Sequence, residues 1–450
     1  MKKTILVVMS FSLSVVILHV VVTFVKGFDA DKFLENLVIS DYEIANASYF
    51  QSRWGYGGAD EALSEEIISE INSYDGVTDG GHIYGFTENA STLVTEEWYR
   101  NSYGNIGLTE EEINQNIEIL KEGDMIADVV GIYGMDEYPL SKLKVIDGDI
   151  SKLKDKEQKY ILAVYMGDDY GNAMENTNFA KTGDKVELIY QTWEIFNTKT
   201  NKTISEEEAY SGSIPDSDID YRIKDTWKET YIVAAEVTVP YAMSYRHFGE
   251  AEFVMNADTF LKDTKTDKTM VYMFDTTDEA NEEIGNFLKN YTEKIDTSLD
   301  YDSRAKYMDE FNELIQMFVF IGGGLCAVVG IIGVLNFIYA ILTSIMTRKH
   351  EFAMLRSIGM TVNQLKHMLM TEGVWYSVLA IISSFIICIL ISLFIGKVIG
   401  SMFWFFTYNF TLLPFMIITP IFLIMGIAVP YLVFRYAKQD SIVDELRNAE

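Results

Sequence analysis

Residues 314–346, LIQMFVFIGGGLCAVVGIIGVLNFIYAILTSIM, form one run without a single Asp, Glu, Lys or Arg. An α-helix rises about 1.5 Å per residue, so about 20 residues cross the roughly 30 Å of bilayer hydrocarbon. Residues 4–26, 374–399 and 412–436 are similar runs, each with at most one charged side chain. The sequence therefore predicts a membrane protein with four transmembrane α-helices.

Basic residues near the ends of these spans set the expected orientation, because cytoplasmic ends are enriched in Lys and Arg. Lys2 and Lys3 precede the first span, four basic residues lie within 347–373, and others follow the fourth span. These positions share one side after four crossings, so we expect both termini of a multi-pass cell (plasma) membrane protein to be cytoplasmic. The exit of the first run, VTFVKGFDADKF, lacks a small-residue cleavage motif, which favours an uncleaved anchor over a signal peptide.

Residues 27–313 are then one large extracytoplasmic domain inserted between the first and second spans. Helix-like stretches such as 60–74 alternate with β-branched and aromatic runs such as KYILAVYM (159–166), which predicts an α+β fold. Residues 26–313 contain 26 Lys and Arg against 60 Asp and Glu, a balance that argues against nucleic acid as a partner. Both cysteines of the chain lie in predicted spans, and an outer domain without disulfides favours a bacterial origin.

Residues 278–313 are predicted to be a helical stalk between the outer domain and the second span. Apolar side chains at 284, 287, 288 and 291 share one helical face, and from Ser303 the chain enters the span without Pro or Gly. Such a rod can carry motion in either direction. On the far side, the short outer loop 400–411 contains Trp404 and Tyr408, which suit the headgroup level of a bilayer.

Motifs of catalysis are missing from the sequence. It contains no G-x-x-x-x-G-K-[ST] phosphate loop, no H-E-x-x-H and no G-x-S-x-G. His82 and His247 are the two outer-domain histidines, 165 positions apart, and we interpret them as ordinary residues rather than metal ligands. The oxygen-rich GDDYGNAMEN (167–176) lacks EF-hand spacing and is predicted to be a turn. We therefore expect no catalytic residue, no metal site and no directly bound cofactor.

Small and polar residues inside the spans predict helix packing. Asn336 is costly against lipid and should face another helix, whereas small residues let helix backbones approach closely. Two small-residue stripes stand out, and intramolecular packing and a dimer interface explain them equally well. The residues of this group are Ser10, Ser14, Gly322, Cys326, Gly330 and Asn336.

The connection 347–373, TRKHEFAMLRSIGMTVNQLKHMLMTEG, predicts two helices with a sharp corner between them. Gly359 suits a left-handed helix cap, and Thr361 with Gln364 forms the capping box T-x-x-Q of the next helix. Phe352, Leu355 and Ile358 are predicted to share one face of the short helix. The pattern is compatible with an interfacial amphipathic helix and with a docking element for a cytoplasmic protein.

This stretch resembles the signature of the FtsX-like permease family, which includes the MacB-type ABC transporters. The family pattern is R-[RK]-x-E-[IF]-[AG]-x-[LM]-[RK]-x-[IL]-G, with a glutamate that opens the third span. Matching residues are Arg348, Lys349, Glu351, Phe352, Ala353, Leu355, Arg356, Ile358, Gly359 and Glu372. The C-terminal DSIVDELRNAE is similar to the closing P-x-x-x-L-R, with Ser441 where proline is usual, and GDKVELIY (183–190) resembles a strand of the MacB periplasmic core domain.

The resemblance implies an FtsX-like permease domain over 314–440 and a coupling helix and connector over 347–373. It implies a membrane permease subunit of an ABC transporter, not itself an enzyme, whose coupling helix sits on a separate cytoplasmic ATPase dimer that uses ATP and Mg. A second permease copy or a paralogous half would complete the assembly in the lipid membrane. Such permeases act by mechanotransmission in export, extraction or resistance to peptides, lipids or lipoproteins. They usually have an amphipathic helix before the first span, so this start lies downstream of the true one or the chain matches the second half of a longer permease.

Two other readings compete with the transporter subunit. A membrane-bound sensor or scaffold would use the outer domain to bind a peptide or cell-wall ligand, or to regulate a cell-wall hydrolase, and the same stalk would serve it. A membrane-anchored hydrolase is disfavoured because no nucleophile and base stand out in the sequence. Stimulation of an ATPase in reconstituted vesicles separates the first two readings.

Overall fold

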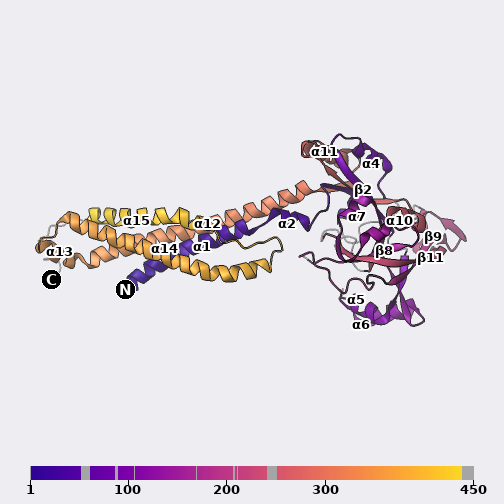
Figure 1. Cartoon of the computed structure of the whole chain (residues 1–450), viewed down its shortest axis with the longest axis horizontal. Helices are drawn as coiled ribbons and strands as arrows, with labels where there is room; N and C mark the ends of the chain where they lie inside the picture. Colours follow the sequence, from indigo (N-terminus) through magenta and orange to yellow (C-terminus); the bar gives the residue numbers. More distant parts are fainter. Residues whose placement is uncertain are drawn as a thin grey trace. The chain divides into compact units, whose positions relative to one another are not determined.

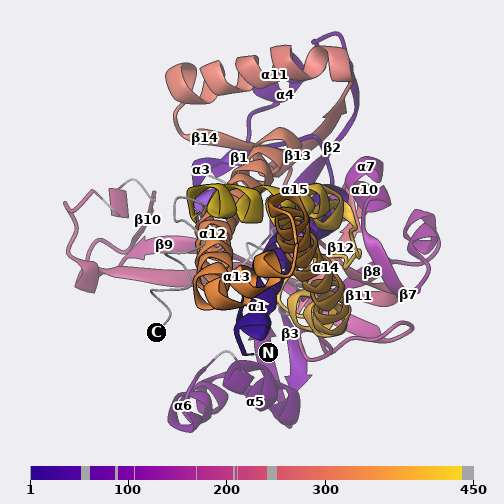
Figure 2. The same cartoon turned by 90° about the vertical axis from the view of Figure 1, so that its left-hand side faces the viewer.

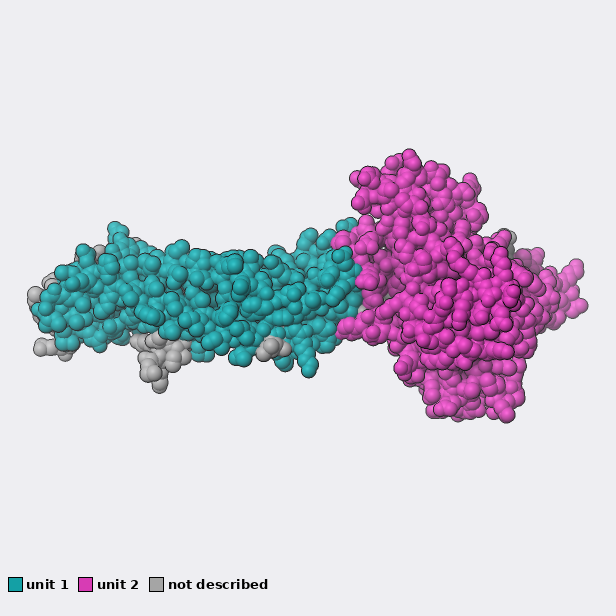
Figure 3. Space-filling view, viewed as in Figure 1, with its two compact units in different colours: residues 1–33, 309–450 teal, residues 34–308 magenta. Residues whose placement is uncertain are grey.

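The computed structural model of the chain describes residues 2–51, 61–86, 90–105, 107–168, 170–205, 208–209, 211–240 and 251–437. His247 and the DSIVDELRNAE segment therefore lie outside the described residues. The chain divides into two compact units, shown in different colours in Figure 3. Residues 1–33 and 309–450 form the helical unit, and residues 34–308 form the sheet unit.

The helical unit consists of long apolar helices that lie side by side (Figure 1). Its elements are α1 (Lys2–Gly27), most of α12 (Arg304–Thr347), α13 (Lys349–Ser357), α14 (Val362–Gly400) and α15 (Leu413–Ala437). Among the described residues, the segments Arg304–Thr347, Val362–Gly400 and Leu413–Arg435 are long and apolar enough to cross a membrane. In α1 the apolar helix runs over Ser12–Gly27, and a fourth span stays a prediction.

Serine hydroxyls form hydrogen bonds between α1, α14 and α15. The Ser377 hydroxyl of α14 donates a 2.7 Å hydrogen bond to the carbonyl oxygen of Phe422 on α15. Ser12 of α1 donates to the carbonyl oxygen of Ala380 at 3.2 Å, and its hydroxyl lies 2.5 Å from that of Ser383. In a setting without water these bonds satisfy hydroxyls that would otherwise be unpaired, so they fix which helix faces meet.

The connection between α14 and α15 folds onto the end of α1. Phe28 and Phe406 form an antiparallel bridge, in which the Asp29 N–H donates to Phe405 O at 2.9 Å and the Thr407 N–H donates to Gly27 O at 2.7 Å. Phe405 and Phe406 are buried, and the polar atoms of Trp404 and Tyr408 have no water exposure. The loop therefore pairs with the chain that leaves α1, and the headgroup position expected for Trp404 and Tyr408 stays a prediction.

One mixed sheet dominates the sheet unit (Figure 2). Among the described residues its order is β14-β1-β13-β2-β6-β12-β8-β11-β9-β3-β5-β4, with β10 paired to β9 and β7 paired to β11. The strands are β1 (Tyr42–Asn46), β2 (Val77–Phe86), β3 (Ala90–Thr95), β4 (Lys121–Glu122), β5 (Met125–Val129), β6 (Ile132–Met135), β7 (Lys144–Gly148), β8 (Tyr160–Tyr165), β9 (Lys185–Asn197), β10 (Lys202–Ile204), β11 (Ile219–Thr238), β12 (Glu252–Asn256), β13 (Thr269–Thr276) and β14 (Leu299–Ser303).

Helices gather at separate parts of this sheet and bury separate apolar cores. Near β1, β2, β13 and β14 lie α4 (Glu65–Asn72) and α11 (Asp278–Asn290), and near β3 and β5 lie α5 (Glu96–Asn105) and α6 (Glu110–Leu120) (Figure 2). The middle of the sheet carries α7 (Glu137–Ser141) and α10 (Ala257–Thr264). Helix α3 (Ala47–Gln51) is a shorter helix of this unit, and α2 (Ala30–Glu35) is the segment in which the chain passes from the helical unit to the sheet unit. The domain is α+β, as the sequence predicts.

The stalk predicted over 278–313 is not one helix. Helix α11 ends at Asn290, a π-helical turn follows over Tyr291–Ile295, and Leu299–Ser303 is the edge strand β14. This strand pairs with β1 in antiparallel register from Leu299 against Asn46 to Ser303 against Tyr42. Asp and Ser are weak helix formers, and pairing with β1 makes this segment a strand. Helix α12 begins at Arg304 and continues into the apolar run, as expected for the chain from Ser303 onward.

Candidate functional site

The connection between α12 and α14 is an elbow built from α13 and two tight junctions. Arg348 is the single residue between α12 and α13, with φ −105° and ψ 14°. At the second junction Gly359 has φ +107°, a left-handed conformation that favours glycine, and the Met360 N–H donates to Leu355 O at 3.0 Å. Thr361 then caps α14: its hydroxyl accepts from the Gln364 N–H, and its own N–H donates to the Gln364 side chain. The predicted capping box is confirmed.

The Arg348 guanidinium joins two carboxylates of the elbow. Its Nε donates to Glu351 Oε2 on α13 at 2.9 Å, and Nη1 donates to Glu372 Oε2 on α14 at 2.9 Å. The other oxygen of Glu372 accepts a 2.6 Å hydrogen bond from the Tyr376 hydroxyl. Partial burial lowers the pKa of Arg348, but Glu351 and Glu372 outweigh it and raise that pKa, so the side chain stays charged.

The apolar residues of α13 divide between the interior and the surface. Phe352 is 5% exposed and packs in the core of the helical unit with Leu365 and Leu369 of α14. Leu355 is partly buried, whereas Ile358 is 82% exposed and Met354 is 48% exposed. The expectation that Phe352, Leu355 and Ile358 present one common face is therefore wrong. Phe352 anchors the helix, and Met354 with Ile358 forms its exposed apolar surface.

The remaining coupling candidates sit around these residues. Glu351 is exposed, and Arg356 is partly buried. The side chain of Lys349 lies outside the described ones. The sequence analysis did not single out Met354, because the sequence does not show which apolar residues of α13 are exposed.

Several predicted packing residues lie between α1 and α12. The Ser14 hydroxyl donates to Val329 O at 3.1 Å, and a Cβ added at Gly322 would stand 2.5 Å from a methyl group of Val21. Cys326 and Asn336 are half-buried, a Cβ at Gly330 would meet nothing within 4 Å, and the side chain of Ser10 is outside the described ones. The sequence reasoning missed Gly373, Ser377 and Gly426, whose contacts join helices far apart in sequence.

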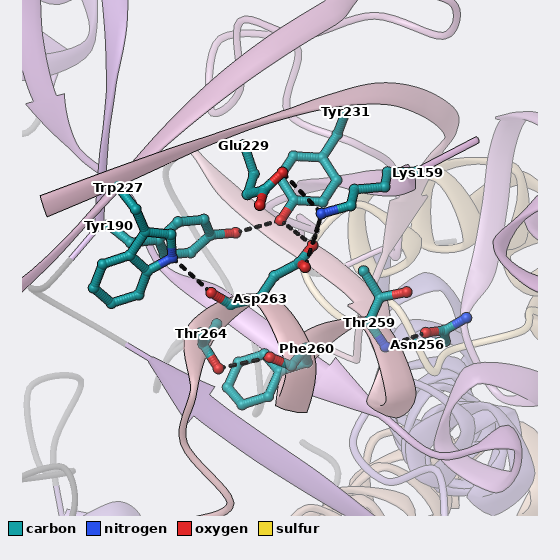
Figure 4. Close-up of polar contacts among 10 residues, drawn as sticks. All are labelled: Lys159, Tyr190, Trp227, Glu229, Tyr231, Asn256, Thr259, Phe260, Asp263 and Thr264. Atoms are coloured by element: carbon teal, nitrogen blue, oxygen red, sulfur yellow. Dashed lines mark hydrogen bonds and ion pairs between the residues drawn. The ribbon is translucent and has the colours of Figure 1, made fainter. Parts of the chain in front are cut away.

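The sheet unit contains a buried polar cluster, which Figure 4 shows. The Asp263 side chain is 2% exposed, accepts from Lys159 Nζ on both oxygens at 2.8 Å, and accepts from the Tyr231 hydroxyl at 2.7 Å. Tyr231 also lies 2.8 Å from the Tyr190 hydroxyl, and Trp227 Nε1 donates to the Asp263 carbonyl at 2.7 Å.

The pKa values of three groups in this cluster, Tyr231, Tyr190 and Lys159, are raised. Burial raises the pKa of Tyr231 and of Tyr190, and neighbouring Asp263 adds to both shifts. Burial lowers the pKa of Lys159, but Asp263 and Glu229 raise it more. The cluster fixes α10 against β11, because Asp263 of α10 bonds to both Tyr231 and Trp227 of β11.

His82 pairs with carboxylates from two helices. Its Nδ1 lies 2.7 Å from Asp136 Oδ2 beside α7, and Nε2 lies 3.6 Å from Glu65 Oε1 at the start of α4. Burial lowers the pKa of His82, but Asp136 and Glu65 raise it more. Among the described residues, no group of three or more His, Cys, Asp or Glu is placed to hold a metal ion.

In the segment 167–176, Asp168 closes a turn. Its Oδ1 accepts from the backbone N–H groups of Tyr170 and Asn172 at 2.9 and 2.8 Å. Gly167 and Ala173 form an antiparallel bridge across this turn. The turn predicted here is therefore correct for the residues that the structure describes.

Comparisons with known proteins find a family match that covers the elbow. Residues 323–441 match the family model of the FtsX-like permease C-terminal domain, which contains α13 and both junctions. The periplasmic region of MacB from Actinobacillus actinomycetemcomitans aligns with 11% identity over 62% of this chain and 98% of its own, with a TM-score of 0.31.

A second solved structure, the extracellular domain of the noncanonic ABC-type transporter YknZ from Gram-positive bacteria, aligns with 10% identity over 58% of this chain and 98% of its own, with a TM-score of 0.27. Among curated proteins no sequence matches the chain. The family match includes residues 348–359 and Glu372, which fit the family's sequence pattern. Residues 323–441 of this chain are therefore similar to the FtsX-like permease C-terminal domain.

Proposed function

We propose that the chain is the membrane permease subunit of an ABC transporter and that α13 seats a separate cytoplasmic ATPase dimer. The observation that carries the proposal is that α13, inside the segment that matches the FtsX-like permease domain, has one buried and one exposed apolar side. Phe352 anchors the helix, while Ile358 and Met354 remain exposed. A helix fixed on one face and apolar on the other suits insertion into a hydrophobic groove of a partner. Exposed apolar side chains at the end of a membrane unit otherwise cost solubility.

Force enters at α13 and leaves along α12 in this proposal. Helix α12 is a single 44-residue helix that contains residues of both units, so movement of its α13 end is carried along one rod. ATP and Mg are used by the partner ATPase, and this chain contributes no catalytic residue. A second permease copy or a paralogous half completes the assembly in a bacterial cell membrane. The outer domain then transmits motion that serves export, extraction or resistance to peptides, lipids or lipoproteins.

A charge placed on the exposed face of α13 tests the seat. Ile358→Asp should abolish co-purification of the ATPase from membranes, because burying an unpaired carboxylate in an apolar groove is costly. Ile119→Asp is the matched control, since Ile119 is 79% exposed on α6 of the sheet unit and should retain the ATPase. Equal amounts of ATPase with Ile358→Asp and Ile119→Asp would contradict the proposed seat. If the wild-type chain stimulates no ATPase in vesicles, a sensor or scaffold becomes the better description.

A further inference from the structure

Building on the proposed function, we infer that Arg348 is a positioning residue that sets the angle of α13 against α14 and passes the movement of α13 to both α12 and α14. Its backbone ends one helix and begins the next: the Arg348 N–H donates to Ser344 O in α12, and Arg348 O accepts from the Phe352 N–H in α13. Its side chain meanwhile reaches α14. Three helices of the helical unit thus meet at one residue.

The guanidinium contacts are geometrically strong. Two different nitrogens reach two different carboxylates at 2.9 Å, and Glu372 is itself held by Tyr376 one turn further along α14. Glu372 is about three turns beyond the Thr361 cap of α14, well away from the covalent corner at Gly359. The chain joins α13 to α14 at the Gly359 corner, and the Arg348–Glu372 bond joins them a second time at the other end of α13. One connection would let α13 rotate against α14, whereas two connections fix the angle between the helices.

The environment makes this contact worth more than a surface ion pair. The side chains of Arg348 and Glu372 are 33% and 26% exposed, and the guanidinium carbon lies 5.1 Å from the centre of the buried Phe352 ring. Exposed ion pairs contribute little, whereas partly buried ones with fixed partners are less screened. A lysine is a poor replacement, because its ammonium is a compact point charge on a flexible stem and lacks the planar guanidinium that holds Nη1 against Glu372.

The role of Arg348 is separable from docking. The exposed residues Met354 and Ile358 would touch the partner, whereas Arg348 faces Glu351, Glu372 and Phe352. Loss of Arg348 should therefore leave the ATPase bound while α13 rotates without moving α14. Packing of Phe352 on Leu365 is the competing explanation for the angle. If that packing alone sets the angle, replacing Arg348 should leave the angle between α13 and α14 unchanged.

The first experiment needs no ATPase. Spin labels at Ser357→Cys on α13 and His367→Cys on α14, both exposed, report the angle in the full chain after Cys326→Ala and Cys388→Ala. Electron paramagnetic resonance should give one narrow distance distribution for the parent and for Glu351→Gln, which keeps the bond to α14. Arg348→Gln, Arg348→Lys and Glu372→Gln should each broaden it. A distribution as narrow with Arg348→Gln as with the parent overturns the inference, whether or not an ATPase binds.

The second experiment measures coupling with the ATPase that co-purifies with the chain. Arg348→Gln should retain the ATPase in the purified complex but lower its stimulation by the permease about fivefold or more, the lower range of ordinary coupling between sites. Arg435→Gln removes an equal charge at an exposed position of α15 and should change neither quantity. Loss of the ATPase itself with Arg348→Gln would make Arg348 a docking residue and overturn the positioning role. If the wild-type chain retains no ATPase, the proposed function fails, and the spin-label result still decides whether Arg348 sets the angle.

Discussion

Gly373 of α14 and Gly426 of α15 meet backbone to backbone. A Cβ added at Gly373 would stand 2.2 Å from the carbonyl oxygen of Gly426, and a Cβ added at Gly426 would stand 2.8 Å from that of Gly373. Distances below 3.0 Å to backbone atoms require the two helices to separate, which also weakens the adjacent bond from Ser377 to Phe422. Overpacking of this kind costs about 1–3 kcal/mol.

Gly373→Ala should therefore lower the melting temperature of the purified chain in detergent, despite the better helix propensity of alanine. Gly330→Ala is the control, because a Cβ there meets nothing within 4 Å and the substitution should be neutral or slightly stabilising. Equal melting temperatures for Gly373→Ala and Gly330→Ala would show that the two helices are not in close contact.

Asp263 is predicted to be the most sensitive carboxylate of the cluster in Figure 4. Asp263→Ala removes the acceptor of Lys159 and Tyr231 at once and leaves both groups without their shared partner. Breaking a buried pair on one side costs about 3–5 kcal/mol, and the partial exposure of Lys159 places the expected loss near the lower end. Chemical denaturation followed by tryptophan fluorescence measures it.

Two control variants are compared with Asp263→Ala. Asp258→Ala changes an exposed aspartate on the same helix and should cost less than about 1 kcal/mol. Tyr231→Phe keeps the carboxylate and removes the two hydrogen bonds of the Tyr231 hydroxyl, to Asp263 and Tyr190, so it should cost about 2 kcal/mol. Asp263→Ala must be clearly worse than both, or the buried cluster is not what fixes α10 to β11.

The local features of the elbow could be predicted from the sequence because they depend on neighbours in the chain. Gly359 and the Thr361–Gln364 box each act within one helical turn, and both are where the pattern placed them. Burial of Phe352 could not be predicted, since it depends on Leu365 and Leu369 of another helix. The bond from Arg348 to Glu372 joins residues 24 positions apart, and spacing alone does not reveal it.

The sheet unit divides in the same way. Runs of β-branched and aromatic residues were enough to predict strands such as β8 and β9 and hence an α+β domain. Strand order was not predictable, because β13 pairs with β1 and β2 far earlier in the chain. The segment Leu299–Ser303 shows the limit most clearly: LDYDS has no strong β pattern of its own and becomes a strand because β1 offers it an edge.

His82 makes the stability of the sheet unit depend on pH. Its folded pKa is raised by Asp136 and Glu65 against the cost of burial, from an ordinary value of 6.5. The pair's contribution is therefore fully present below pH 6.5 and is lost as the pH rises through the raised folded pKa. Burial raises the pKa of Asp136, but bonds from His82 lower it more, so its contribution is lost only as the pH falls through that lowered value.

Thermal unfolding of the wild-type chain and of His82→Gln between pH 5 and 9 should show this window. The wild type should be more stable by about 2 kcal/mol at the acidic end, the ordinary contribution of one hydrogen bond to a charged partner. The difference should shrink at the alkaline end, where the imidazole is neutral. A difference that stays constant over the whole range would mean that His82 contributes through packing on Tyr84 and Tyr272 alone.

Phe352 on α13 and Ile358, the residue that caps its C-terminal end, should respond in opposite ways to the same truncation. Phe352→Ala empties a buried site in the helical unit and should destabilise the chain by about 3 kcal/mol or more, measured as a lower melting temperature in detergent. Ile358→Ala removes a side chain that is 82% exposed, so stability should change by less than about 0.5 kcal/mol. In the proposed complex, ATPase co-purification should nevertheless fall with Ile358→Ala, because an apolar contact with the partner would be lost. If Ile358→Ala lowers the melting temperature as much as Phe352→Ala does, Ile358 is buried against the chain itself, and α13 has no free face on which an ATPase can sit.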